Sequence, residues 1–229
     1  MGRTKLARFE YNANSANVIE PGKEVFTNIK GNWRSFFGNE QPITLELGCG
    51  RGEYTTGLAK VFPQRNYIGV DVKGARIWKG SSVANENQLK NAAFLRAPIL
   101  LIKDFFEKGE VDEIWITFPD PKPRDRDEKN RLSGPVFLSN YKEILSEGGI
   151  VHLKTDNKPL YDFTLENLLL ADKGNTCFPY YISELTYTDD LYNSPLLEEH
   201  YGIETTYERK FRESVGNKIN YLRFRLYTA

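Results

Sequence analysis

The chain has 229 residues, of which 40% are hydrophobic and 27% are charged, as in ordinary globular proteins. Two cysteines, Cys49 and Cys177, provide neither a disulfide framework nor metal-ligand spacing, and no apolar run approaches the roughly 20 residues that a bilayer span needs. We therefore expect a cytoplasmic protein with no membrane partner and no metal site.

The net charge is zero, but the charges are segregated along the chain. Residues 1–8 carry three bases and no acid, residues 184–204 carry six acids and no Lys or Arg, and residues 207–229 carry six bases and two acids. Basic patches of this kind can bind phosphates even when the total charge is neutral. From charge alone, solvated charged faces remain the simpler interpretation.

Short apolar runs alternate with longer amphipathic ones along the whole chain. The predicted strands are 42–47, 66–72, 92–96, 113–118, 149–155, 180–187 and 220–227. The predicted helices are 22–37, 53–62, 74–90, 99–107, 135–146 and 159–171. This order predicts an α/β fold, with a doubly wound, mostly parallel seven-stranded sheet and an antiparallel edge. The chain contains no long linker, and we expect a single domain over residues 1–229 with a short basic N-terminal arm of about residues 1–20.

The segment LELGCGRGEY follows the first predicted strand and opens a helix. Gly48 and Gly50 allow a tight turn and close approach of a ligand to the backbone. The dinucleotide fingerprint would need a third glycine at position 53, where the chain has Glu53 instead. That carboxylate and Glu46 would repel a pyrophosphate but attract a cationic ligand such as S-adenosyl-L-methionine. Asp71, which ends the next strand 21 residues after Gly50, is placed to accept hydrogen bonds from a ribose. NAD remains the alternative cofactor, and a plain strand–helix turn the alternative without function.

The segment TFPDPKPRDRDEKNR follows the fourth predicted strand. Ligands of open α/β sheets bind outside the carboxyl ends of the strands, so Asp120 is expected at the mouth of the cofactor site. Pro119 and Pro121 restrict the backbone around it and predict a stiff ledge. The alternative is a Pro-Asp-Pro turn with a solvated carboxylate.

The blocks ELGCGRG, GVD, FPDPKPRDRDEKNRL, LKTD and TTYE, in this order, resemble the tRNA (guanine-N7-)-methyltransferase family of the bacterial TrmB type. The resemblance covers about residues 40–210. The chain departs from the family's usual pattern at Lys122, Arg124, Asp127 and Asn130, where the family usually has Trp, Lys, His and Arg. It also has Ala97 and Pro98 where an acidic residue is expected after the third strand.

The resemblance implies a Rossmann-like class I fold and methylation, with S-adenosyl-L-methionine, of guanosine N7 in the variable loop of tRNA (position 46 in tRNA numbering). It implies that Asp120 is catalytic. It further implies cofactor contacts by Glu46, Gly48, Gly50, Asp71, Ala97 and Asp120, and substrate contacts by Arg124, Asp156, Thr205, Tyr207 and Glu208. The partner would be tRNA, bound by a monomer or a homodimer.

Three of these residues have structural alternatives. Thr205-x-x-Glu208 before an amphipathic stretch is a capping box, and Asp156 lies where it would begin the next helix. Two other functions also stay open: a methyltransferase acting on another RNA or a small molecule, and a catalytically silent RNA-binding subunit.

Overall fold

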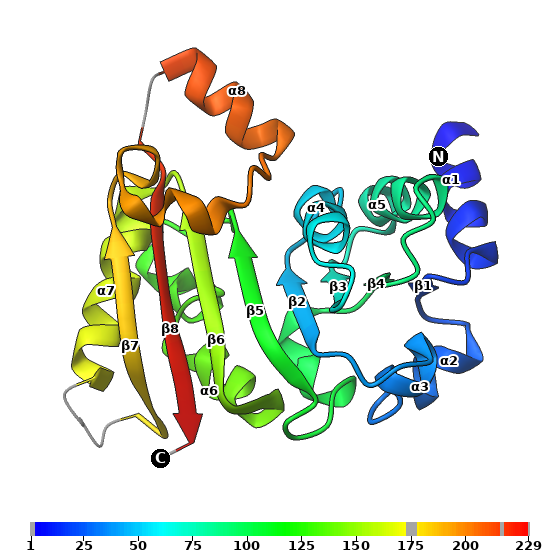
Figure 1. Cartoon of the computed structure of the whole chain (residues 1–229), viewed down its shortest axis with the longest axis horizontal. Coiled ribbons are helices and arrows are strands. Elements are labelled where there is room, and N and C mark those ends of the chain that lie inside the picture. The colour runs from blue at the N-terminus through cyan, green and yellow to red at the C-terminus, as the bar shows by residue number, and fades with distance from the viewer. Residues whose placement is uncertain (1–2, 173–177, 216–217, 229) are drawn as a thin grey trace.

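One eight-stranded sheet with helices on both faces forms the frame of the protein, seen in a computed structural model that describes residues 3–172, 178–215 and 218–228 (Figure 1). Cys177 lies outside these residues. The strands are β1 Val18–Ile19, β2 Ile43–Leu47, β3 Asn66–Val70, β4 Ala92–Leu95, β5 Val111–Thr117, β6 Leu145–Thr155, β7 Tyr180–Thr188 and β8 Asn220–Thr228. The α-helices are α1 Arg3–Asn14, α2 Glu24–Asn28, α3 Trp33–Phe37, α4 Glu53–Val61, α5 Gly74–Glu86, α6 Pro135–Ile144, α7 Lys158–Asp172 and α8 Thr206–Val215. Short 3₁₀ helices are η1 Ile99–Asp104, η2 Asp125–Asn130, η3 Leu191–Asn193 and η4 Pro195–His200.

The strand order is β1-β4-β3-β2-β5-β6-β8-β7. The pairs from β1 through β6 are parallel, and β8 runs antiparallel to both β6 and β7. The chain winds outward in opposite directions from β2 and β5, so the loops after these two strands meet at the switch point of the sheet. The predicted doubly wound fold with an antiparallel edge is confirmed.

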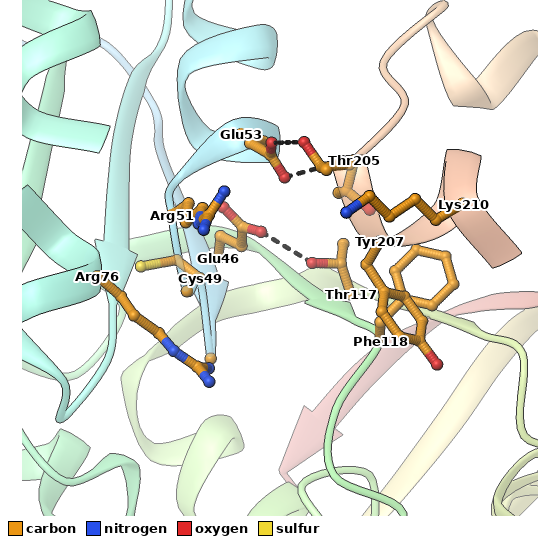
Figure 2. A pocket seen from close by; sticks show the side chains of 13 residues that line it. Glu46, Cys49, Arg51, Glu53, Arg76, Thr117, Phe118, Thr205, Tyr207 and Lys210 are labelled. Atoms are coloured by element: carbon orange, nitrogen blue, oxygen red, sulfur yellow. Dashed lines mark hydrogen bonds between the residues drawn. The ribbon is translucent and has the colours of Figure 1, made fainter. Parts of the chain in front are cut away.

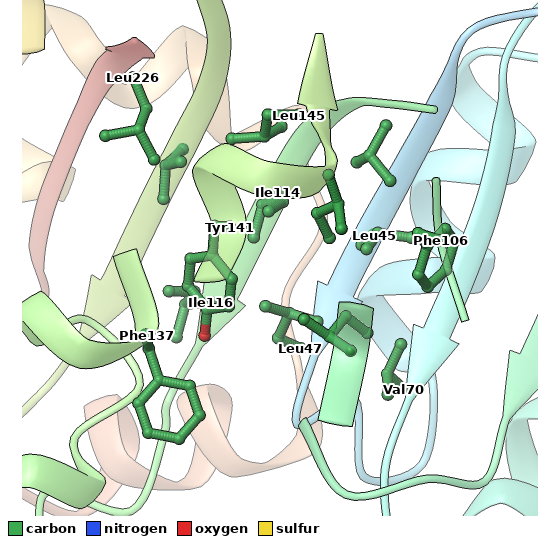
Figure 3. Packing of buried hydrophobic residues seen from close by; sticks show 14 of the residues in the cluster. Leu45, Leu47, Val70, Phe106, Ile114, Ile116, Phe137, Tyr141, Leu145 and Leu226 are labelled. Carbon is green, nitrogen blue, oxygen red and sulfur yellow. The ribbon is translucent and has the colours of Figure 1, made fainter. Parts of the chain in front are cut away.

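Two apolar cores cover the two faces of the sheet. Alternate side chains of β2 and β5, including Leu45, Leu47 and Ile116, face a core that is closed by Phe106 and Tyr141 (Figure 3). The intervening side chains of the same strands face α4 and α5. Polar side chains are buried on this second face, and Glu46 and Thr117 lie at the carboxyl ends of β2 and β5, 4% and 6% exposed.

The structure corrects several predicted boundaries. The sheet has one strand more than predicted, because the two-residue β1 pairs with β4 outside any recognisable apolar run. The helix predicted over 22–37 is two helices, separated where Gly31 adopts a φ of +73°. Residues 99–107 contain only the 3₁₀ helix η1, which begins after Pro98. The expected basic arm contains the helix α1, and no helix within the described residues has the length and hydrophobicity to span a membrane.

Candidate active site

The loop between β2 and α4 turns on three glycines with positive φ. Gly48, Gly50 and Gly52 have φ values of +78°, +54° and +66°, a region that other residues rarely adopt. A Cβ on Gly52 would lie 2.4 Å from Cε1 of Phe94, so this glycine permits the helix to pack on the sheet. A Cβ on Gly50 would meet nothing nearer than a backbone oxygen at 4.0 Å. The backbone at Gly50 therefore faces open space, as a ligand-binding turn requires.

Asp71 supports this loop from the end of β3. Its carboxylate accepts hydrogen bonds from the backbone N–H of Gly50 (3.0 Å) and of Lys73 (2.8 Å), and Asp71 is only 8% exposed. It therefore fixes the distance between the glycine loop and the start of α5. Two oxygens provide about four acceptor positions, so the carboxylate retains capacity for a ligand hydroxyl.

Glu46 is a buried carboxylate directly beneath the loop. Its oxygens accept hydrogen bonds from the Thr55 backbone N–H (2.8 Å), the Thr55 hydroxyl and the Thr117 hydroxyl (2.8 Å). Burial raises the pKa of Glu46 to about 7, although these hydrogen bonds oppose the shift. A buried carboxyl that titrates near neutrality becomes a strong partner for a cation brought beside it.

A cavity of about 440 Å³ opens above Glu46 at the switch point (Figure 2). Its wall consists of residues from the end of β2 and the glycine loop, the end of β5, and the starts of α4, α5 and α8: Glu46, Gly48, Cys49, Gly50, Arg51, Glu53, Arg76, Thr117, Phe118, Thr205, Thr206, Tyr207 and Lys210. Five of the predicted site residues are therefore brought together here, namely Glu46, Gly48, Gly50, Thr205 and Tyr207.

The Pro-Asp-Pro segment forms a strained ledge beside this cavity. Phe118 and Lys122 adopt φ values of +47° and +48°, which is uncommon for side chains of this size and typical of functional sites. Between them, the Asp120 side chain is 68% exposed and lies 2.8 Å from the Lys122 ammonium. The hydrogen bond from Lys122 lowers the pKa of Asp120, which therefore remains an accessible anion.

The predicted residues Arg124 and Ala97 lie away from the cavity wall. Arg124 is exposed and forms an ion pair with Asp127 at 2.6 Å, within the turn that begins η2. Ala97 is 2% exposed and packs into the apolar core. Any contact between Ala97 and a ligand would therefore have to use its backbone groups.

Tyr207 and Phe118 place two aromatic rings at the cavity edge. Their centroids are 5.4 Å apart with an interplanar angle of 56°, and Tyr207 is 53% exposed. The Tyr207 hydroxyl donates a 2.8 Å hydrogen bond to Asp156, which follows β6. This bond holds Asp156 next to the rings, whereas Asn157, not Asp156, caps α7 by accepting from the Leu160 N–H at 2.9 Å.

Thr205 and Glu208 form the capping box expected at the start of α8. The Glu208 N–H donates to the Thr205 hydroxyl (3.1 Å), and the Glu208 carboxylate accepts from the Thr205 N–H (3.4 Å). The same carboxylate is fully buried and also binds Lys154 and the Tyr192 hydroxyl. It faces the sheet, so Thr205 and Tyr207 reach the cavity while Glu208 does not.

Sequence reasoning missed the contacts that hold α8 over the cavity. Glu53, at the start of α4, accepts hydrogen bonds from the Thr206 N–H (3.0 Å) and the Thr206 hydroxyl. Figure 2 shows Lys210 extending from α8 toward the side of the cavity that carries Arg51 and Glu53. The acid at position 53 was the only local signal, because its partner lies 153 residues away.

The carboxylates and the glycine loop around the cavity fit a ligand that carries both a cationic centre and hydroxyl groups. Glu46 and Glu53 provide buried or partly buried anions, Gly50 leaves room for close approach, and Asp71 retains acceptor capacity. S-adenosyl-L-methionine has a sulfonium, an ammonium and two ribose hydroxyls, and so matches this set. A pyrophosphate would meet the carboxylates of Glu46 and Glu53 at the same place.

Solved structures with this fold include RNA methyltransferases. The chain superimposes on the 16S rRNA methyltransferase KamB with a TM-score of 0.62 and 16% identity, over 86% of this chain and 93% of that one. It also superimposes on a 16S rRNA (adenine(1408)-N(1))-methyltransferase variant from Catenulisporales acidiphilia, solved with cosubstrate SAM, with a TM-score of 0.60 and 14% identity, over 87% and 91% of the two chains. At these identities the likeness shows the fold alone.

Sequence relatives are much closer. The family model described as "Putative methyltransferase" matches residues 40–221. The tRNA (guanine-N(7)-)-methyltransferase of Cytophaga hutchinsonii is 51% identical and that of Christiangramia forsetii 44% identical, each over 98% of both chains. The enzyme of the same name from Bacteroides thetaiotaomicron is 40% identical over 99% of this chain and 87% of that one. These matches confirm the resemblance that the motifs carry, and the chain belongs to the tRNA (guanine-N(7)-)-methyltransferase family.

Proposed function

We propose that the protein methylates N7 of a guanosine in the variable loop of tRNA, at position 46 in tRNA numbering, with S-adenosyl-L-methionine as methyl donor. The observation that carries this proposal is identity of up to 51% over nearly the full length to relatives named for the reaction. The cavity at the switch point, with its anionic floor and the exposed Asp120 beside it, supports the same assignment. With tRNA as its partner, the protein would act in the cytoplasm, as a monomer or a homodimer.

The residues around the cavity divide into those that would hold the cofactor and those that would hold the base. Glu46, Gly48, Gly50 and Asp71 would hold the cofactor, which supplies an electrophilic methyl group when bound. The remaining proposed cofactor contacts are Asp120 and, on the adenine side, the backbone of Ala97. None of these groups has to gain or lose a proton during methyl transfer.

Guanine N7 has an in-plane lone pair and no hydrogen, so its attack needs no general base. The protein has to align the base and to stabilise the positive charge that develops on the purine. Asp120 is the anion placed for the second task, because it is accessible and its pKa is lowered. Phe118 and Lys122, on either side of Asp120, have positive φ values, which persist only where the surrounding structure constrains the backbone.

Recognition of guanine fits the aromatic edge of the cavity. A base displaced from the tRNA fold would stack on Tyr207 and Phe118, as displaced bases do on aromatic side chains. Asp156, held by the Tyr207 hydroxyl, would accept from the guanine N1–H and exocyclic amine. Thr205 lines the same wall, and Arg124 would contact a phosphate if its pair with Asp127 opens. The Glu208 carboxylate already has four hydrogen-bond or ion-pair partners. We therefore propose that it supports this wall and does not contact the base.

Incubation with S-adenosyl-L-methionine labelled in its methyl group and with unmodified tRNA tests the proposal. We expect label on guanine N7 of the variable loop, located by cleavage at the modified base. Label on another atom of the tRNA, or transfer only to another RNA, would show that the protein catalyses a different methyl transfer from the one proposed. Cofactor binding without transfer would favour an RNA-binding subunit.

A further inference from the structure

A row of exposed cations leads away from the cavity along α5. Between Val72 and Asn85 the chain carries Lys73, Arg76 and Lys79 and no acid. All three are exposed, and their spacing of three residues places them on one side of the helix. Arg76 lines the cavity itself, so this row begins at the candidate active site.

The helix α1 adds further cations next to α5. It packs against α5, where the Asn12 side chain donates a 2.8 Å hydrogen bond to the Gly74 carbonyl oxygen (Figure 1). The Arg8 guanidinium lies over the Trp78 ring, 4.8 Å from its centroid, and Lys5 is exposed one turn before. Lys5, Arg8, Lys73, Arg76 and Lys79 together are called the α1–α5 basic face below.

The loop that begins at Asp120 differs from this face because most of its bases are paired with acids of the same loop. From Asp120 to Arg131, both included, it has five bases and four acids. Three of its bases are neutralised within the loop, by the pairs Lys122–Asp120, Arg124–Asp127 and Arg131–Glu128. Within the described residues, no side chain of the α1–α5 basic face forms an ion pair. The charge available to an anionic partner is therefore greater on α5 and α1 than on the loop.

We propose that the α1–α5 basic face binds the sugar–phosphate backbone of the tRNA next to the target guanosine. The inference rests on the proposed function and adds the surface along which the RNA lies. Four of these five cations are exposed, and cations without ion-pair partners that are spread over two helices suit a line of phosphates better than one compact anion. The nearness of Lys73 to Asp120, whose pKa it helps to lower, connects this surface with the acceptor site.

A charge-matched pair of variants tests the proposal. Lys5→Ala/Lys79→Ala removes two cations of the face that do not line the cavity. Lys60→Ala/Lys90→Ala removes two exposed lysines from the opposite, amino-terminal end of the parallel strands, where α4 ends and β4 begins. The affinity for unmodified tRNA is measured at several salt concentrations for both variants and the wild type. Thermal melting and cofactor titration check that each variant is folded.

We expect the first variant to bind tRNA roughly tenfold more weakly and to lower the slope of log K against log salt by about 1.5, since two phosphate contacts are lost. Its KM for tRNA should rise while kcat at saturating tRNA is retained. The control variant should match the wild type in affinity and slope. An unchanged slope in the first variant, or an equal change in both variants, would overturn the proposal. The slope is measured by tRNA binding and is therefore independent of the methylation assay. If the wild type bound tRNA but did not methylate it, that result would count against the proposed function alone.

Discussion

Lys154 and Glu208 form an ion pair in the interior of the protein. The Lys154 Nζ lies 2.7 Å and 2.9 Å from the two oxygens of Glu208, and the side chains are 1% and 0% exposed. Burial lowers the pKa of Lys154 to about 8. Burial alone would raise the pKa of Glu208, but bonds from His200 and Lys154 lower it, so both groups are charged at neutral pH. The pair joins the end of β6 to the start of α8, and thereby sets where Tyr207 stands over the cavity.

We expect removal of either charge to destabilise the fold. Lys154→Met or Glu208→Leu alone should lower the free energy of unfolding by about 3–5 kcal/mol, because the remaining charge is buried without a partner. The double variant should cost less than the sum of the two single ones. Urea unfolding of all four proteins measures the coupling. Strict additivity would show that the two side chains do not interact.

Gly50 and Gly52 are expected to respond differently to an added methyl group. Gly52→Ala places a Cβ 2.4 Å from the Phe94 ring at a φ of +66°, so it should destabilise the protein by about 3 kcal/mol. Gly50→Ala meets no neighbour and should cost only about 1 kcal/mol, but it fills space that faces the cavity. We therefore expect Gly50→Ala to fold and to bind the cofactor weakly. Thermal melts with and without cofactor distinguish loss of stability from loss of cofactor binding. If the cofactor raised the melting temperature of Gly50→Ala as much as that of the wild type, the expected loss of binding would be contradicted.

Much of the site could be read from the sequence because its signals are local. The glycines, Asp71 and Asp120 each follow a strand, Glu46 is the second-last residue of one, and a parallel sheet brings these strand ends together. The family and the class of fold follow from the same blocks.

Other parts depend on contacts between distant segments and leave no local pattern. Glu53 meets Thr206 across 153 residues, and Lys154 meets Glu208 across 54. From the sequence, Glu208 could therefore be either a helix-capping residue or a substrate contact. Only the packing of α8 on β6 shows which way its carboxylate points. The strand β1 is two residues long and forms by pairing with β4, so its sequence carries no alternation to detect.

The pKa of Glu46 predicts how cofactor binding depends on pH. In the folded protein without ligand this pKa is raised to about 7 from 4.5, so the folded state holds a proton that the unfolded state has released between these values. Stability contributed by this group is therefore lost as pH rises through that window. A cation bound beside Glu46 requires the carboxylate, so binding should release a proton below about pH 7.

We expect the affinity for S-adenosyl-L-methionine to rise by up to about tenfold per pH unit from about pH 5.5 to about pH 7. Calorimetry in buffers of different ionisation enthalpy counts the proton released. Glu46→Gln, which keeps the shape but cannot ionise, should bind more weakly and without pH dependence in this range. A wild-type affinity that is flat with pH would mean that Glu46 does not pair with the ligand's cation.

The exposed Asp120 leads to the sharpest prediction about turnover. Asp120→Ala should lower kcat by roughly 100-fold, the scale seen when one preorganised electrostatic contact to a transition state is removed. Binding of tRNA should change little, because a single carboxylate beside Lys122 adds no attraction for phosphate. Asp125→Ala is the matched control, since it removes the same charge from an exposed position five residues further along the same loop. Single-turnover methylation, with enzyme and cofactor in excess over the tRNA, measures the chemical step, and equal rates for both variants would remove Asp120 from the mechanism.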